Sequence, residues 1–157
     1  MRYFVMEHIN GDMPRRPQGY AAEVRETNDN KIDMGSLYGV DFNARDGLIS
    51  GRLKLLMEKY MPKYKFAPVV FLDAKKQEQL DFWRFCPPFL AAGSYRAEYK
   101  NTGVVSHFCT GNKNAPKIFS VRSPKNIWSV VVHASVAESI LRRGILGLKL
   151  TRLTEEN

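Results

Sequence analysis

The most regular pattern of apolar and polar residues in this chain lies near its C-terminus. Asn126 to His133 contains Ile127, Trp128 and three consecutive valines, an aromatic and β-branched run of strand length. Ser135 and Glu138 then have the Ser-x-x-Glu spacing of a capping box, in which each side chain satisfies the other residue's free backbone N–H. The pattern predicts a strand followed by a helix that begins at Ser135.

The end of this helix and the element after it are also indicated. Arg142 and Arg143 place cations where the C-terminal helix dipole favours them, and Gly144 can adopt the left-handed conformation that ends many helices. Leucines then occupy alternate positions of residues 146–150, which predicts a strand with one apolar face.

A second helix followed by a strand is predicted earlier in the chain. Apolar residues recur at spacings of three and four from Ile49 to Tyr60, which marks one apolar helix face, and Ser50 is placed to cap this helix. Pro62 lies where such a helix stops. Residues 69–72 form a short apolar run suited to a buried strand.

Shorter strands are expected at residues 2–6, 104–109 and 118–121, where aromatic and β-branched residues are frequent. Residues 10–46 are polar and rich in turn formers, above all at 27–33, so we expect mostly loop there. This is a long connection for one domain. It indicates either a functional loop, which would compete as a binding site, or short elements that the pattern does not resolve.

The middle of the chain, residues 73–101, is dense in aromatic side chains, and Pro87 and Pro88 prevent a continuous helix through it. Two interpretations stay open: a loop and strand pair that adds rings to the core, or an exposed aromatic and arginine patch for a partner. Because Trp, Tyr and Arg dominate interface hot spots, the candidate partner-binding residues are Trp83, Arg84, Tyr95, Arg96 and Tyr99.

Length and composition favour one α+β domain over all 157 residues, with a mixed, mostly antiparallel sheet and two or more packed helices. The two cysteines, Cys86 and Cys109, fall in no ligand or disulfide-framework spacing and are expected to be reduced. The first ten residues are too short and too polar for a signal peptide or a membrane span. We therefore expect a cytoplasmic protein that is not associated with a membrane.

The net charge of +8 is unevenly distributed along the chain. Residues 1–47 hold 6 Lys and Arg against 8 Asp and Glu, whereas residues 48–157 hold 18 against 8. The basic part indicates either a solvated face or an acidic partner surface. Lysines and tyrosines also interleave from Lys54 to Lys65, so a nucleic-acid-binding module is the alternative interpretation, although the spacing matches no known nucleic-acid motif.

Candidate chemistry is sparse. His107 and Cys109 are two possible metal ligands at alternate strand positions, which is too few for a site, and Cys109 as a nucleophile would need His107 or His133 as its base. A small core cysteine and a structural hydrogen bond of His133 before the helix are the simpler interpretations.

Asp41 and Asp46 are explained as solvated turn residues. Gly144 and Gly147 follow a helix instead of opening one, so they form no phosphate loop. We predict no catalytic residue, metal or cofactor.

The order of these segments resembles a known family. The resemblance rests on three segments. The first two are the Tyr3-Phe4-Val5-Met6 strand and the helix start from Leu48 to Leu56. The third is the C-terminal part, which runs from Ile118-Phe119 through the valine strand, Ser135 and Ile140-Leu141 to Gly144-Ile145-x-Gly147-Leu148. This pattern resembles immunity family eleven of the bacterial polymorphic toxins, typified by a myxobacterial domain. The family often has Ile-Thr-Gly where this chain has Ile145-Leu146-Gly147, and an acidic motif where this chain has residues 89–94.

The resemblance implies a non-enzymatic immunity protein that binds and neutralises a cognate toxin by covering its active site or another surface that it needs. It supplies no contact residues, because immunity proteins meet their toxins through surfaces that differ from pair to pair. The basic part of the chain adds the expectation that the contacted toxin surface is acidic. The identity of the toxin and the oligomeric state are not indicated by the sequence.

Overall fold

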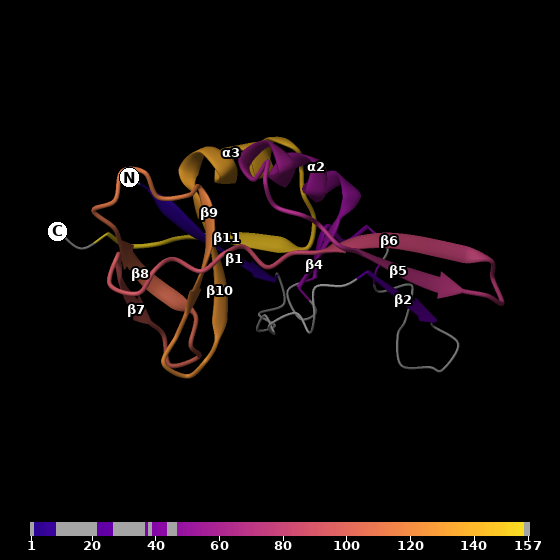
Figure 1. Ribbon diagram of the computed structural model, residues 1–157, viewed down its shortest axis with the longest axis horizontal. Coiled ribbons are helices and arrows are strands. Elements are labelled where there is room, and N and C mark those ends of the chain that lie inside the picture. Colours follow the sequence, from indigo (N-terminus) through magenta and orange to yellow (C-terminus); the bar gives the residue numbers. More distant parts are fainter. Residues whose placement is uncertain (1, 9–21, 27–36, 38, 44–46, 156–157) are drawn as a thin grey trace.

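The structure is a computed structural model that describes residues 2–8, 22–26, 37, 39–43 and 47–155. The described part has an α+β fold in which helices α2 and α3 cover one side of a set of mostly antiparallel strands (Figure 1). This confirms the fold class expected from the pattern. No described helix is long and apolar enough to cross a membrane. The expected turns at residues 27–33 lie outside the described residues.

A four-stranded antiparallel sheet forms the centre of the fold. Its strands, in spatial order, are β11 (Leu148–Arg152), β1 (Tyr3–His8), β10 (Trp128–His133) and β9 (Ile118–Arg122). Val5 pairs with Val131 and Thr151, so the first and last strands of the chain are neighbours. The strands expected at residues 2–6, 118–121, 126–133 and 146–150 are therefore confirmed, with small shifts at their ends.

The three consecutive valines of β10 have a clear physical reason. Val130 and Val132 point into a core cluster that includes residues of α2 and α3, whereas Val131 points into a second cluster on the opposite face. Because both faces of the strand are covered, apolar residues stand at successive positions instead of alternating with polar ones.

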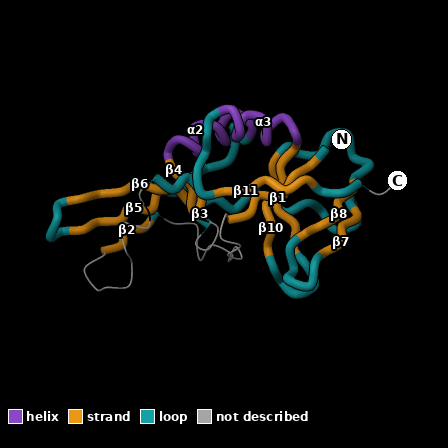
Figure 2. The backbone as a smooth tube through the Cα atoms, turned by 180° about the vertical axis from the view of Figure 1, so that it is seen from behind, coloured by secondary structure: helices purple, strands orange, loops and turns teal. Residues whose placement is uncertain are grey.

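A five-stranded sheet lies beside the central one. Its spatial order is β2 (Glu23–Glu26), β5 (Pro68–Asp73), β6 (Glu78–Arg84), β4 (Leu48–Ser50) and β3 (Phe42–Asn43). Among these described strands, the β2–β5 pair is parallel and the other three pairs are antiparallel. The turn between β5 and β6 projects away from the rest of the fold in both views (Figures 1 and 2). Strands β2 and β3 are short elements within the polar segment expected to be mostly loop.

A small antiparallel hairpin packs on the other side of the central sheet. It consists of β7 (Arg96–Tyr99) and β8 (Val105–Cys109), and the register of their pairing shifts between Glu98 and Tyr99. Phe108 of β8 is buried against Tyr3 and Phe119 of the central sheet, with ring centroids 5.0 and 5.1 Å away. The fold thus has helices, central sheet and hairpin in successive layers, with the five-stranded sheet to one side.

The two helices are α2 (Gly51–Tyr60) and α3 (Ala134–Arg142). Ser50 caps α2 as expected, since its hydroxyl accepts a hydrogen bond from Leu53 N at 3.2 Å. The predicted capping box of α3 is wrong, because His133 is its N-cap. The strand delivers the imidazole to the helix start, where His133 Nδ1 accepts the Ser135 N–H at 3.1 Å.

Candidate functional site

The five candidate partner-binding residues fall on two separate sheets. Trp83 and Arg84 lie at the end of β6 in the five-stranded sheet, whereas Tyr95, Arg96 and Tyr99 lie on or beside β7 in the hairpin. They do not form one patch. Their role in binding stays a prediction, and the surroundings of each residue decide how much of it is accessible.

Arg84 has a structural ion pair. Its side chain is buried and donates a hydrogen bond to Glu23 Oε2, across the intervening strand β5. Hydrogen bonding from Arg25, at 2.8 Å, and the positive charge of Arg84 hold the pKa of Glu23 below its ordinary value despite partial burial. This group of charges ties β2 to β6, and removing Arg84 would leave Glu23 paired with Arg25 of its own strand and break the link to β6.

Trp83 is half-buried and supports the start of α2. The Lys54 ammonium lies 5.3 Å from the centre of its ring, and a methyl group added at Gly51 would lie 3.2 Å from the same ring. The glycine at the first position of α2 therefore lets the helix approach the indole closely. Part of the ring remains accessible to a partner.

The alternation of β7 separates the other three candidates. Tyr95 and Tyr99 pack against the core cluster beneath the hairpin, and the Tyr95 ring stacks on Phe108 with centroids 5.6 Å apart. Tyr99 donates its hydroxyl to the Arg122 carbonyl at 3.0 Å, and burial and the neighbouring Tyr95 raise the pKa of Tyr99 to about 12. Arg96 is exposed on the opposite side of the strand. These tyrosines thus match the interpretation of rings added to the core.

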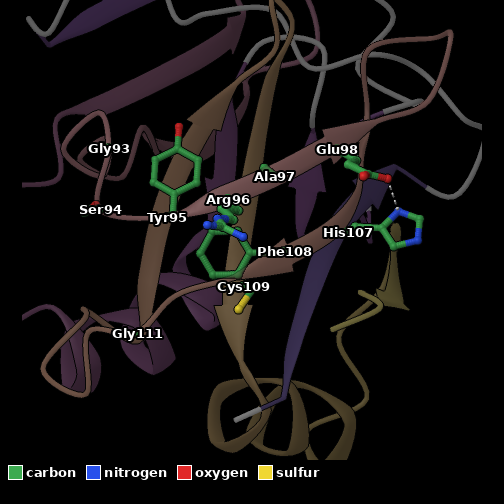
Figure 3. A pocket seen from close by; sticks show the side chains of 10 residues that line it. All are labelled: Gly93, Ser94, Tyr95, Arg96, Ala97, Glu98, His107, Phe108, Cys109 and Gly111. Carbon is green, nitrogen blue, oxygen red and sulfur yellow. Dashed lines mark ion pairs between the residues drawn. The ribbon is translucent and has the colours of Figure 1, made fainter. Parts of the chain in front are cut away.

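An open cavity of about 510 Å³ lies at the hairpin, lined by residues of both strands and of the turns around them (Figure 3). His107 Nδ1 lies 3.4 Å from Glu98 Oε2 and 3.0 Å from the hydroxyl of Ser106. The interpretation of Cys109 as a small core cysteine is wrong, because its thiol is exposed at the end of β8. The thiol points away from the His107 ring in Figure 3. The geometry therefore gives Cys109 no base at His107, which nucleophilic catalysis would require.

Metal ligands do not gather at this cavity. Within the described ranges, no three His, Cys, Asp or Glu side chains are placed to share an ion. His133, the other histidine considered as a base, is occupied by capping α3, as the structural interpretation expected. Burial and the nearby charge of Lys117 lower the pKa of His133, which favours the neutral imidazole that can accept a hydrogen bond.

A second surface, which the sequence pattern did not single out, lies on the outer side of α2. We call it the helix groove: a cavity of about 540 Å³ lined by Arg52, Leu55, Leu56, Glu58, Lys59 and Arg143. Leu55 is 63% exposed, while Leu53, Leu56 and Met57 are buried. An apolar residue on the polar face of an otherwise amphipathic helix is the sequence signal that could have indicated this surface.

The wall of the helix groove at Arg52 is fixed by Asp41. Expected to be a solvated turn residue, Asp41 is instead 6% exposed, because the turn folds against Leu146 in the segment just before β11. Its carboxylate accepts hydrogen bonds from Arg52 Nη2 at 2.5 Å, from Ser50 Oγ at 2.7 Å and from Leu146 N at 2.7 Å. The other residue of that expectation, Asp46, lies outside the described residues.

These contacts also set the ionisation of Asp41. Burial opposes the charged form, but the hydrogen bonds from Arg52, Ser50 and the Leu146 backbone outweigh it and hold the pKa of Asp41 below its ordinary value. Arg52 in turn donates to the backbone carbonyls of Arg143 and Gly144 at 3.3 and 3.0 Å. Arg52 therefore joins the start of α2 to the C-terminal end of α3.

The charges of the helix groove are only partly paired. Glu58 forms an ion pair with Lys54, and Arg52 pairs with Asp41. Lys59 and Arg143 have no carboxylate partner among the described residues, although Arg143 Nη1 lies 3.5 Å from the Ser139 carbonyl. Two cations that face the same cavity are thus available to an anionic group.

The tyrosines of the basic stretch from Lys54 to Lys65 are engaged inside the fold. The Tyr60 hydroxyl lies 2.7 Å from the Ser139 hydroxyl, and Tyr64 accepts the Cys86 backbone N–H at 2.9 Å. Both rings pack against the core cluster beneath the helices. They are therefore not presented for stacking on bases, which single-strand binding by this stretch would need.

Comparisons of the chain with protein-family models, with curated proteins and with solved structures returned no match.

Proposed function

We propose that this chain is a cytoplasmic immunity protein that neutralises a cognate bacterial toxin by stoichiometric protein–protein contact, without catalysis. The observation that carries the proposal is the exposed Leu55 in the helix groove, beside Lys59 and Arg143, two cations with no carboxylate partner in the part of the chain that the structure describes. An apolar anchor next to arginine and lysine suits a protein partner with an acidic surface. The family-like order of strands and helices in the sequence adds support.

The competing function, a small nucleic-acid-binding module, would use the same positive charge. The engaged hydroxyls of Tyr60 and Tyr64 and the exposed leucine both favour a protein partner over a single strand. A protein interface gains from aliphatic contact area, whereas a phosphate backbone gains only from the cations.

The test is co-expression with the protein encoded beside this chain's gene. The proposal predicts that cells expressing the neighbouring protein grow only when this chain is present, and that the two proteins co-purify in one complex. Absence of both growth rescue and co-purification would contradict the proposal. A mobility-shift assay with single-stranded DNA at two salt concentrations separates the alternative, which predicts affinity that falls steeply with salt.

A further inference from the structure

We propose that the helix groove binds an acidic segment of the partner protein, with an apolar side chain packed on Leu55 and carboxylates paired with Lys59 and Arg143. The proposal rests on the proposed function for the identity of the partner, but not for the chemistry of the site. It names both the contacted surface and the class of segment that fits it.

The exposure of the leucines at the groove supports packing of an apolar partner side chain on Leu55. Leu55 is 63% exposed at its rim, and Leu56 beneath it is only 1% exposed. A partner side chain that packs on Leu55 removes apolar area from water on both sides of the contact. Because α2 is fixed by its buried face, Leu55 is presented by a rigid element, and little ordering entropy is lost on binding.

The charges that line the groove indicate that the partner segment is negatively charged. Three cations and one carboxylate line the groove, and the carboxylate, Glu58, is already paired with Lys54 outside the lining. Lys59 lies one helical turn after Leu55, and Arg143 approaches from the end of α3. Carboxylates on either side of an apolar anchor can therefore meet a cation each, and a basic segment would be repelled.

The walls of the groove do not need to form on binding. Arg52 is held by Asp41 and by the C-terminal carbonyls of α3, so the two helices are joined at this end before a partner arrives. At the other end, Tyr60 reaches the Ser139 hydroxyl and the Ser135 carbonyl. Contacts between the helices at both ends keep Leu55, Lys59 and Arg143 at fixed separations.

The first experiment measures binding of the purified product of the neighbouring gene to variants of this chain. Leu55→Ala and Lys59→Glu are each expected to weaken binding about tenfold, the scale of an interface residue that contributes somewhat more than 1 kcal/mol. Arg143→Gln is expected to weaken binding about threefold and to reduce its dependence on salt. Circular dichroism of each variant checks that the fold is retained.

Two matched controls lie in the five-stranded sheet and its projecting turn. Val24→Ala shortens a side chain that is as exposed as Leu55, and Lys75→Glu makes the same charge reversal as Lys59→Glu. Both are expected to stay within about twofold of the wild type, as surface residues outside an interface do. A complex that forms with the wild type and is equally insensitive to all three groove variants would overturn the proposal and leave the proposed function standing.

The second experiment does not depend on the neighbouring protein. Isotope-labelled chain is titrated with a synthetic peptide of alternating Glu and Leu, with its Gln and Leu counterpart, and with a twenty-nucleotide oligothymidylate, while amide resonances are followed. The proposal predicts shifts at residues 52–59 and 143 with the Glu peptide that are lost in Leu55→Ala and are weak with the Gln peptide. The proposal would be overturned by peptide shifts centred elsewhere or by concentration-dependent self-association at this surface. It would also be overturned if the oligonucleotide shifted the same residues as the Glu peptide, and did so equally in the wild type and in Leu55→Ala.

The two experiments separate the two proposals. Failure of the neighbouring protein to bind the wild type contradicts the proposed function, and the peptide titration then decides the groove on its own. Binding of the neighbour that survives Leu55→Ala and Lys59→Glu contradicts only the assignment of the groove.

Discussion

The substitution Asp41→Asn removes the carboxylate that joins Arg52, Ser50 and the backbone of Leu146. An asparagine keeps one acceptor oxygen, and its NH₂ group would face donors in place of the second oxygen. At least one of the inward-facing donors, Ser50 Oγ–H or Leu146 N–H, then loses its acceptor. The substitution changes little in volume, so its effect reports on hydrogen bonding and charge.

The magnitude follows from those two donors. A hydrogen bond to a charged acceptor contributes about 1.5–3 kcal/mol, and a buried donor left without a partner costs about 1–3 kcal/mol. We therefore expect Asp41→Asn to lower the free energy of unfolding by about 2–4 kcal/mol. Arg52 is half exposed, so its ion pair with Asp41 is screened by solvent and Arg52→Ala should have the smaller effect.

Urea unfolding followed by tryptophan fluorescence measures this loss, since Trp128 is 2% exposed in the core and will report on unfolding. The control is Asp81→Asn, an exposed carboxylate that accepts a hydrogen bond from the Gln79 side-chain amide at 2.8 Å and should change stability by less than about 0.5 kcal/mol. A loss below about 0.5 kcal/mol for Asp41→Asn would refute the reasoning.

The pH dependence of the same variant gives an independent check. The pKa of Asp41 is lower in the folded chain than its ordinary value, so the unfolded chain binds more protons between those two values. The stability that the charged carboxylate contributes is complete above its ordinary pKa of about 4 and is lost as the pH falls through the folded value. Asp41→Asn should lack this component of acid destabilisation, and an unchanged acid profile would count against the assignment.

Three further substitutions test other parts of the structure. His133→Asn keeps an N-cap for α3. Because the pKa of His133 is lowered in the folded chain, the wild type should lose stability as the pH falls below about 6.5, and the variant should lack this loss. Thermal unfolding of both proteins at pH 5 and 8 measures the difference. Gly103→Ala should cost more than about 2 kcal/mol, since φ is 91° and a methyl group would lie 2.4 Å from Ile127, whereas Gly93→Ala, at φ 84° with open space around it, should cost only about 1–2 kcal/mol; comparable urea midpoints for the two would contradict this. Cys109→Ser should leave stability and growth rescue unchanged, and loss of rescue with an intact fold would favour the nucleophile interpretation.

Much of the fold could be predicted because its signals are local. The valine run of β10, the serine cap of α2 and the glycine at the end of α3 each depend on residues within one or two turns of each other. Gly144 adopts a φ of 59°, as its position after the helix predicted. The α+β class followed from the order of these segments.

The N-cap of α3 differs from the one that the sequence motif predicts. Ser135 and Glu138 have the spacing of a capping box, but the strand before them carries His133 into the capping position first. The imidazole satisfies the free N–H of Ser135, so the box is not needed. Two competing acceptors a few residues apart cannot be ranked from sequence alone, because the direction of the incoming strand decides between them.

The surfaces were harder to predict than the elements, since they depend on contacts between distant segments. The sequence predicts Arg84 as an exposed hot-spot residue, but its side chain is buried in an ion pair with Glu23, 61 residues earlier. The local pattern predicts a solvated turn at Asp41, but its partner Leu146 lies 105 residues later. The helix groove likewise needs Arg143 beside α2, a proximity that no local pattern encodes.

The central claim is stoichiometric binding of a toxin, and calorimetric titration with the purified, inactivated product of the neighbouring gene tests it most directly. We predict a single binding event with one partner per chain, and an affinity that weakens as the salt concentration rises from low to physiological values. No heat of binding at micromolar concentrations, together with continued growth inhibition when both proteins are expressed, would contradict it.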